Sequence, residues 1–194
     1  LIDKHIKKKA YAEASKLISD GYVQAERENL RGLISDYEEM MLDIAVKTGD
    51  HSAARELTER LFFEAREQIK YLAKLKGYVS AEEWPTYRNQ LLERLATEYR
   101  YGSGLLPRIY EYEDMWDEMY ALVKKQRDIR LIVQYHAEFA QRFPAQLAEM
   151  YEQHVYKIME QSTSRPVYRE CVDYLRRIMQ VDSEERALMI ADDL

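Results

Sequence analysis

Apolar residues recur at every third or fourth position between Pro144 and Met179, in two runs separated by a short polar break. This spacing places them on one side of an α-helix in each run. The break, from Gln161 to Pro166, is long enough only for a chain reversal, so the two runs predict an antiparallel helical hairpin. The two stripes consist of Leu147, Met150, Tyr151, His154, Val155, Ile158 and Met159, then Val167, Tyr168, Cys171, Val172, Tyr174, Leu175, Ile178 and Met179.

The same spacing predicts helices along the rest of the chain. We expect them over about 2–20, 23–48, 50–76, 84–95, 105–112, 115–125 and 129–140, with a last one that includes 187–190. Gly21, Gly49 and Gly77 stand where helices should end. Asp50 should cap the helix that follows it. The residues from Ser80 to Glu83 are typical of a capping box. In such a box the Ser80 hydroxyl accepts a hydrogen bond from the Glu83 amide, and the Glu83 carboxylate accepts one from the Ser80 amide.

Composition supports the same class, because 6 glycines and 4 prolines in 194 residues supply little turn chemistry for a β-rich fold. We therefore predict an all-α array of antiparallel helical hairpins. Ile109-Tyr110-Glu111 and Met150-Tyr151-Glu152 lie 41 residues apart, which favours a repeat of two helices. This period is typical of α-α superhelices or solenoids, of tetratricopeptide or HEAT type but without either consensus.

One segment, Tyr101 to Gly104, interrupts the helical pattern with two glycines and a serine. We expect it to divide a part with long helices, 1–101, from a part with repeated hairpins, 102–194, within one continuous helical domain. The chain starts at Leu1 and ends within a helical pattern. We therefore expect it to be a segment of a larger protein.

The net charge of −6 disfavours a dedicated nucleic-acid binder, since phosphate binding depends on a surplus of Lys and Arg. The exception is a basic run at the start, which we interpret first as a solvated helix face and second as a nucleic-acid contact. It consists of Lys4, Lys7, Lys8 and Lys9. No apolar run is long enough for a transmembrane helix and no signal peptide is recognisable, so we expect a cytoplasmic protein with no membrane contact.

No catalytic, cofactor-binding or metal-binding residue is predicted. Cys171 is the single cysteine and lies on an apolar stripe, so we expect a buried thiol and no zinc site. None of the 4 histidines follows a glutamate by three residues, the spacing of carboxylate-bridged metal sites in bundles. His136 and His154 are predicted to be core residues with a hydrogen-bond partner. An enzyme whose site is spread over several helices is the alternative.

Part of the chain resembles the helical region that follows a SWIM-type zinc finger in a group of bacterial proteins of poorly defined function. The resemblance covers 71–179, a little over half of the chain, and is carried by helix-packing residues. They are Tyr71, Lys74, Leu75 and Lys76, Trp84, Ile109-Tyr110 with Glu113, Tyr135, Phe143-Pro144, Met150-Tyr151, Arg165-Pro166 with Tyr168, and Tyr174-Leu175. It implies that only the helical portion is present here, because the Cys-x-Cys and Cys-x-His zinc ligands have no counterpart.

Aromatic residues gather within an acidic stretch in the middle of the chain, and include Tyr112, Trp116 and Tyr120. Our first interpretation is that these aromatic residues pack between helices. They are also our candidate anchors for a protein or peptide partner, since Tyr and Trp dominate interface hot spots, and the acidic surroundings would favour a basic partner. The sequence thus predicts a non-catalytic scaffold or protein-interaction segment. The alternative is a nucleic-acid-associated accessory domain acting with a zinc finger outside this chain.

Overall fold

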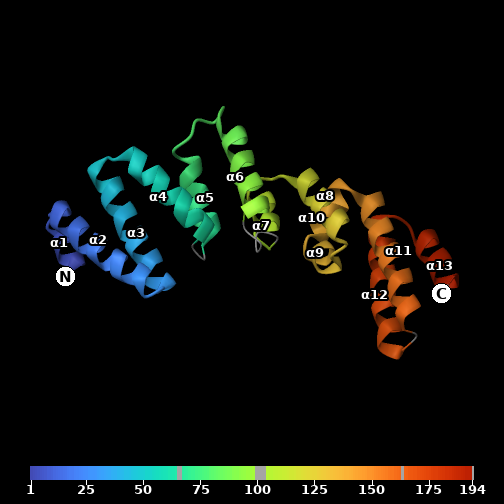
Figure 1. The fold of residues 1–194 in the computed structure, drawn as a ribbon. Helices are drawn as coiled ribbons and strands as arrows, with labels where there is room; N and C mark the ends of the chain where they lie inside the picture. Colours follow the sequence, from blue (N-terminus) through green and yellow to red (C-terminus); the bar gives the residue numbers. More distant parts are fainter. Residues whose placement is uncertain (65–66, 99–103, 163, 194) are drawn as a thin grey trace. The chain divides into compact units, whose positions relative to one another are not determined.

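The computed structural model describes residues 1–64, 67–98, 104–162 and 164–193, and in these ranges it contains helices and no strand (Figure 1). The predicted all-α fold is confirmed, with helices that are neighbours in sequence packed against one another. The chain divides into two compact units, Leu1–Glu113 and Asp114–Leu194. The segment from Tyr101 to Gly104, where the boundary between the two parts is expected, lies outside the described residues except for Gly104.

Unit 1 is built from helices that pack in succession: α2 on α3, α3 on α4 and α4 on α5. Its main core is formed by residues of the successive helices α3 to α7 and includes the fully buried Leu61, Phe62, Leu75 and Ile109. A smaller core joins α2 to α3 through Ala14, Ile18 and Ile44. The helices are α1 (Ile2–Lys7), α2 (Tyr11–Arg27), α3 (Arg31–Thr48), α4 (His51–Glu64), α5 (Gln68–Lys76), α6 (Trp84–Glu98) and α7 (Leu106–Tyr112).

Several predicted boundaries in unit 1 were wrong. The single helix expected over 2–20 is broken at Lys9, and the next break comes at Asn29 instead of Gly21. Lys9 and Asn29 adopt left-handed backbone conformations, with φ of 58° and 54°. A left-handed conformation is uncommon for lysine, so the sequence pattern contained no sign of a helix end at Lys9. Asparagine adopts it more readily, but the helix predicted over 23–48 runs through Asn29. The helix expected over 50–76 is likewise two helices, α4 and α5.

The predicted caps of unit 1 are mostly confirmed. Gly49 follows α3 with φ of 76°, and the Asp50 carboxylate accepts from the Ala53 amide at 3.0 Å. Ser80 Oγ accepts from the Glu83 amide at 3.2 Å, as the capping box requires. The return bond differs, because the Glu83 carboxylate accepts from the Ser80 hydroxyl at 2.9 Å instead of from the Ser80 amide.

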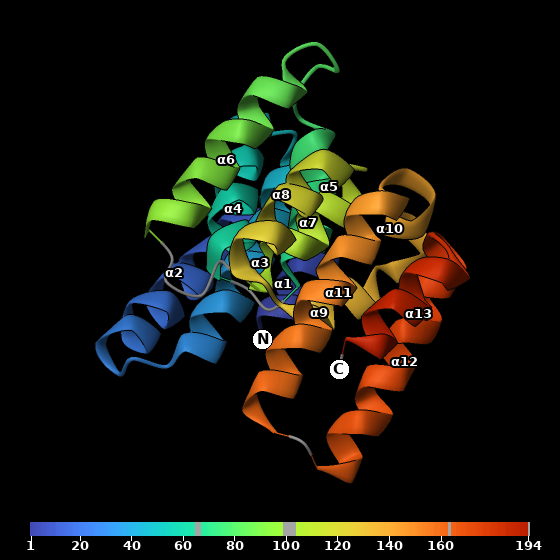
Figure 2. The ribbon, with the colours of Figure 1, turned by 90° about the vertical axis from the view of Figure 1, so that its right-hand side faces the viewer.

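Unit 2 contains the predicted hairpin, in which α11 and α12 run side by side and antiparallel (Figures 1 and 2). The helix expected over 129–140 is interrupted at Tyr135, which separates α9 from α10. The helices are α8 (Trp116–Gln126), α9 (Ile129–Gln134), α10 (His136–Arg142), α11 (Pro144–Gln161), α12 (Arg165–Val181) and α13 (Glu184–Asp192).

The aromatic residues of unit 2 form much of its core. The Trp116 ring meets the rings of Tyr135 and Phe139 edge-on, at centroid distances of 5.9 and 6.3 Å. Tyr151 is fully buried on α11 and stacks on Tyr174 of α12 at 5.6 Å. Such pairs add to the free energy gained from burial alone. The Tyr151–Tyr174 pair joins the two helices of the hairpin, and a neighbouring stripe of α11 lies toward the α8–α9 turn.

Candidate functional site

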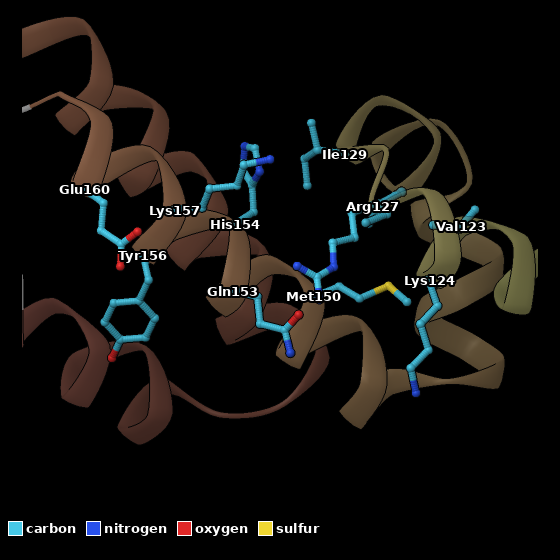
Figure 3. Close-up of a pocket in the computed structure, with 11 residues that line it drawn as sticks. Val123, Lys124, Arg127, Ile129, Met150, Gln153, His154, Tyr156, Lys157 and Glu160 are labelled. Carbon is cyan, nitrogen blue, oxygen red and sulfur yellow. The ribbon is translucent and has the colours of Figure 1, made fainter.

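A cavity of about 470 Å³ lies in unit 2 between the α8–α9 turn and one side of α11 (Figure 3). This volume is in the range of small-ligand pockets in proteins. Its apolar lining comes from Val123, Ile129, Ile132 and Met150. The polar and charged lining is supplied by Lys124, Arg127, Gln153, His154, Tyr156, Lys157 and Glu160.

The α8–α9 turn forms one wall because two residues fix its backbone. Arg127 ends α8 in a left-handed conformation, with φ of 52°, and its amide donates to the Val123 carbonyl at 2.8 Å. Asp128 then begins α9, and its carboxylate accepts from the Arg130 amide at 3.0 Å. Burial alone would raise the pKa of Asp128, but its hydrogen bonds to Arg130 outweigh this and lower the pKa. The Arg127 side chain extends from this turn toward α11 (Figure 3).

The opposite wall is one stripe of α11. Met150, Gln153, His154 and Lys157 are spaced by three or four residues, so they share one side of the helix. The buried stripe is different and consists of Leu147, Ala148, Tyr151 and Val155. The sequence pattern had placed Met150 and His154 on the same packing stripe as Tyr151. In the structure Met150 and His154 line the cavity, and the His154 ring also packs edge-on against Tyr174 of α12 at 4.9 Å, next to the Tyr151 stripe.

Charge around the cavity is unevenly distributed. Three cations, Lys124, Arg127 and Lys157, face one carboxylate, Glu160. Among the residues that the structure describes, none of the three cations forms a salt bridge. Lys124 instead lies with Nζ 5.8 Å from the Tyr120 ring centroid. A group of unpaired cations beside apolar surface favours a ligand that carries both negative charge and hydrophobic groups.

Two histidines lie in or near this region and both have a lowered pKa. Burial is the main cause at His154, where Lys157 adds to it and Glu170 opposes it. The His154 Nε2 is buried without a hydrogen bond, 3.8 Å from a Glu170 carboxylate oxygen. His136 has its partner, since Nδ1 lies 2.9 Å from the Tyr151 hydroxyl. The expected hydrogen-bond partner is thus present at His136 and absent at His154 among the described residues.

The three predicted anchors lie in different environments. Tyr112 is 44% exposed in unit 1, and the Lys76 Nζ lies 5.9 Å from its ring centroid. Trp116 is only 7% exposed in unit 2, and its indole N–H donates to the Asp114 carboxylate. Tyr120 is half-buried and stacks on Phe143 at 4.9 Å. Packing therefore accounts for Trp116, and a shared role of the three in partner binding stays a prediction.

The cationic cavity was not predicted, although its residues are visible in the sequence. Lys124 and Arg127 were assigned to a helix end and a turn, and Lys157 was given no role. The spacing Lys124-x-x-Arg127 could have marked a basic helix end. Only the packing of α9 and α11, which brings Ile129 and Met150 to the same cavity, could have shown that Lys157 lies near these two cations.

A second cavity, of about 510 Å³ in unit 1, is a weaker candidate. It is lined largely by charged side chains of both signs. Arg94 pairs with Glu59, and Arg60 lies 3.5 Å from Glu56, so these charges are satisfied internally. Such a balanced lining gives no preference for one kind of ligand.

Within the described ranges, no group of three or more His, Cys, Asp or Glu side chains could hold a metal ion. Among the same residues, no helix combines the length and the apolar character needed to cross a membrane.

No protein-family model matches this chain, and no curated protein or solved structure matches it either. The resemblance to the helical region of SWIM zinc-finger proteins therefore stays a prediction.

Proposed function

We propose that this chain is a non-catalytic protein-interaction segment, and that the cavity between α8, α9 and α11 binds an acidic, partly hydrophobic peptide of a partner. The observation that supports this most directly is the set of three cations without salt bridges, Lys124, Arg127 and Lys157, around an apolar lining. A Glu or Asp of a peptide would pair with these cations, while neighbouring apolar side chains cover Ile129 and Met150, the half-buried apolar residues of the lining.

An acidic peptide fits this site better than a nucleic acid does. The net charge of −6 repels a polyanion at long range, and Glu160 would oppose a continuous phosphate backbone. The nucleic-acid alternative depends instead on the lysines at the start of the chain. Lys4, Lys7, Lys8 and Lys9 are all exposed in unit 1.

Two further parts of this proposal come from the sequence. The single cysteine, Cys171, is free and buried, which is compatible with a reducing compartment such as the bacterial cytoplasm. The proposed family context is the helical scaffold of a SWIM zinc-finger protein. Cys-x-Cys and Cys-x-His pairs in the full-length gene product would support it.

The test is a titration of the 194-residue protein into a fluorescein-labelled peptide of alternating Glu and Leu residues. Lys124→Glu and Lys157→Glu should each weaken binding about tenfold, since each replaces an attractive charge by a repulsive one. Lys125→Glu is the matched control. Lys125 is the neighbouring exposed lysine on α8 but does not line the cavity, so its change should leave affinity nearly unaltered.

Two outcomes would contradict the proposal. Equal losses in Lys124→Glu and Lys125→Glu would show that only net charge matters. Tighter, salt-dependent binding of oligothymidylate that is lost on replacing Lys7 and Lys8 by Glu would favour the nucleic-acid alternative.

A further inference from the structure

Helix α12 carries two apolar stripes, one buried within unit 2 and one largely exposed. Cys171 and Ile178 are buried, and Tyr174 of the same stripe stacks on α11. The second stripe, which we call the outer stripe, consists of Tyr168, Val172, Leu175 and Met179. Leu175 is half-buried, whereas Tyr168, Val172 and Met179 are 45%, 45% and 43% exposed.

The spacing of the outer stripe is that of a coiled-coil seam. Its members follow one another at intervals of four, three and four residues, the alternation of d and a positions in a heptad. A stripe of this kind extends about 16 Å along the helix. Scattered exposed apolar residues are normal on protein surfaces, but a continuous seam of this length marks a contact site.

One edge of the outer stripe is basic. An arginine stands three residues before Val172 and three before Met179, the two members at a positions, so both arginines take the e position on the same edge. These are Arg169 and Arg176, whereas Arg165 takes the a position that precedes Tyr168. Arg176 has a weak, highly exposed pairing with Asp173 at 3.3 Å. In the described part of the chain, Arg165 and Arg169 form no salt bridge.

We propose that the outer stripe binds an amphipathic α-helix of another protein, one with an apolar seam and an acidic edge. The partner's seam would cover Tyr168, Val172 and Met179, and its carboxylates would pair with the arginine edge. This surface is separate from the cavity, since no cavity-lining residue belongs to α12. It is thus a second contact site in the proposed interaction segment. The experiments on the two sites are independent, so either proposal can be wrong while the other holds.

Charge disfavours a second copy of this chain as the occupant. In an antiparallel pair of α12 helices centred on the stripe, equivalent edges meet. Arg169 of one copy would then lie beside Arg176 of the second copy, and like charges at these positions oppose pairing. A helix with glutamates at the same places would replace this repulsion by attraction.

The probe is a synthetic peptide of about three heptads with Leu at a and d and Glu at e and g, titrated against the 194-residue protein. Its glutamates repel one another and keep it from pairing with itself. We expect it to bind at least about tenfold more tightly than a peptide with Lys in place of Glu. The double variant R169E/R176E should reverse this preference. Because both arginines are exposed, the substitutions leave the core intact.

Val172→Ser and Met179→Ser should each weaken binding of the Glu peptide, with unchanged circular dichroism and melting temperature. The matched controls are Leu188→Ser and Met189→Ser on α13, which are 57% and 66% exposed but lie outside the stripe, and both should bind as the wild type does.

Three results would overturn the proposal. One is equal affinity for the Glu and Lys peptides, and another is an unchanged preference in R169E/R176E. The third is a different occupant of the outer stripe. This would be shown by a dimer in sedimentation that Val172→Ser disrupts, or by binding of the protein to phosphatidylglycerol vesicles but not to the Glu peptide.

Discussion

The indole N–H of Trp84, the first residue of α6, donates a hydrogen bond of 2.7 Å to Oε2 of Glu113, the residue that follows α7. The Glu113 side chain is only 3% exposed. It also accepts from Lys76 at 2.9 Å and from Arg88 at 3.4 Å. One carboxylate therefore connects α5, α6 and α7. A buried carboxylate with this many donors stabilises the packing of these helices only while it is ionised.

We predict that Glu113→Gln lowers the free energy of unfolding by about 1 to 2 kcal/mol at pH 7, because the amide accepts charged hydrogen bonds poorly. Burial alone would raise the pKa of Glu113, but the hydrogen bonds from Trp84 and Lys76 outweigh it, so the pKa lies below its ordinary 4.5. A lowered pKa in the fold gives stability that is present above pH 4.5 and lost as the pH falls through the folded pKa.

Urea unfolding of wild type and Glu113→Gln between pH 3 and 7 measures the free energy of unfolding of each. The difference in this free energy between the two proteins should shrink below about pH 4.5. Glu82→Gln is the control, because Glu82 is exposed nearby in the same unit and forms no ion pair among the described residues. A pH-independent difference would show that Glu113 acts through shape and not through charge.

The Trp84–Glu113 bond also shows what sequence could predict here. The periodic apolar spacing correctly placed helices around both residues, and the Ser80 cap located the start of α6. The pairing itself joins residues 29 positions apart. No local pattern specifies such a contact, because it depends on how α5, α6 and α7 pack.

Helix ends were predictable where glycine or a capping side chain marks them, as at Gly49 and Asp50. They were missed at Lys9 and Asn29, which take left-handed conformations without being glycine. The end of the helix predicted over 115–125 is confirmed within one residue, just before the left-handed Arg127. The left-handed Arg127 also helps to form the cavity. The turn was predicted, but the candidate site was missed because its walls come from separate helices, which no local pattern brings together.

A second prediction concerns the buried Glu38 on α3 and its partly exposed partner, Arg60 on α4. The Glu38 side chain is 1% exposed, and Oε1 accepts from Arg60 Nη1 at 3.2 Å. Its Oε2 has no hydrogen-bond partner in the described part of the chain. Arg60→Met should therefore lower the free energy of unfolding by about 2 kcal/mol at pH 7, since it leaves a buried carboxylate unpaired. Arg60 itself is 40% exposed, which limits the loss.

The pH dependence here has the opposite sign to that of Glu113. Burial raises the pKa of Glu38 above its ordinary 4.5, and Arg60 only partly opposes this. A raised pKa gives stability that is full below pH 4.5 and lost as the pH rises through the folded pKa. The defect of Arg60→Met should thus fade in acid. In a Glu38→Gln background, Arg60→Met should lower the free energy of unfolding only slightly. A decrease as large as in the wild type would contradict the argument that the buried charge is responsible.

The last prediction concerns Gly21, which the sequence pattern marked as a helix end but which lies inside α2. A Cβ at this position would stand 2.5 Å from the Tyr37 hydroxyl oxygen and 2.6 Å from Cζ of the same ring on α3. Gly21 thus leaves room for the Tyr37 ring, which would have to move if a Cβ were added. Gly21→Ala should gain about 1 kcal/mol from helix propensity but lose more to this clash, for a net loss of about 1 kcal/mol.

Thermal and urea unfolding of three variants separate the two effects. Gly32→Ala on α3 is the control, because nothing lies within 4 Å of its added Cβ, and it should be neutral or stabilising. In a Tyr37→Ala background the clash is absent, so Gly21→Ala should become stabilising by about 1 kcal/mol. If Gly21→Ala instead stabilises the wild type, the Tyr37 ring moves aside at little cost, and Gly21 is not needed for its packing.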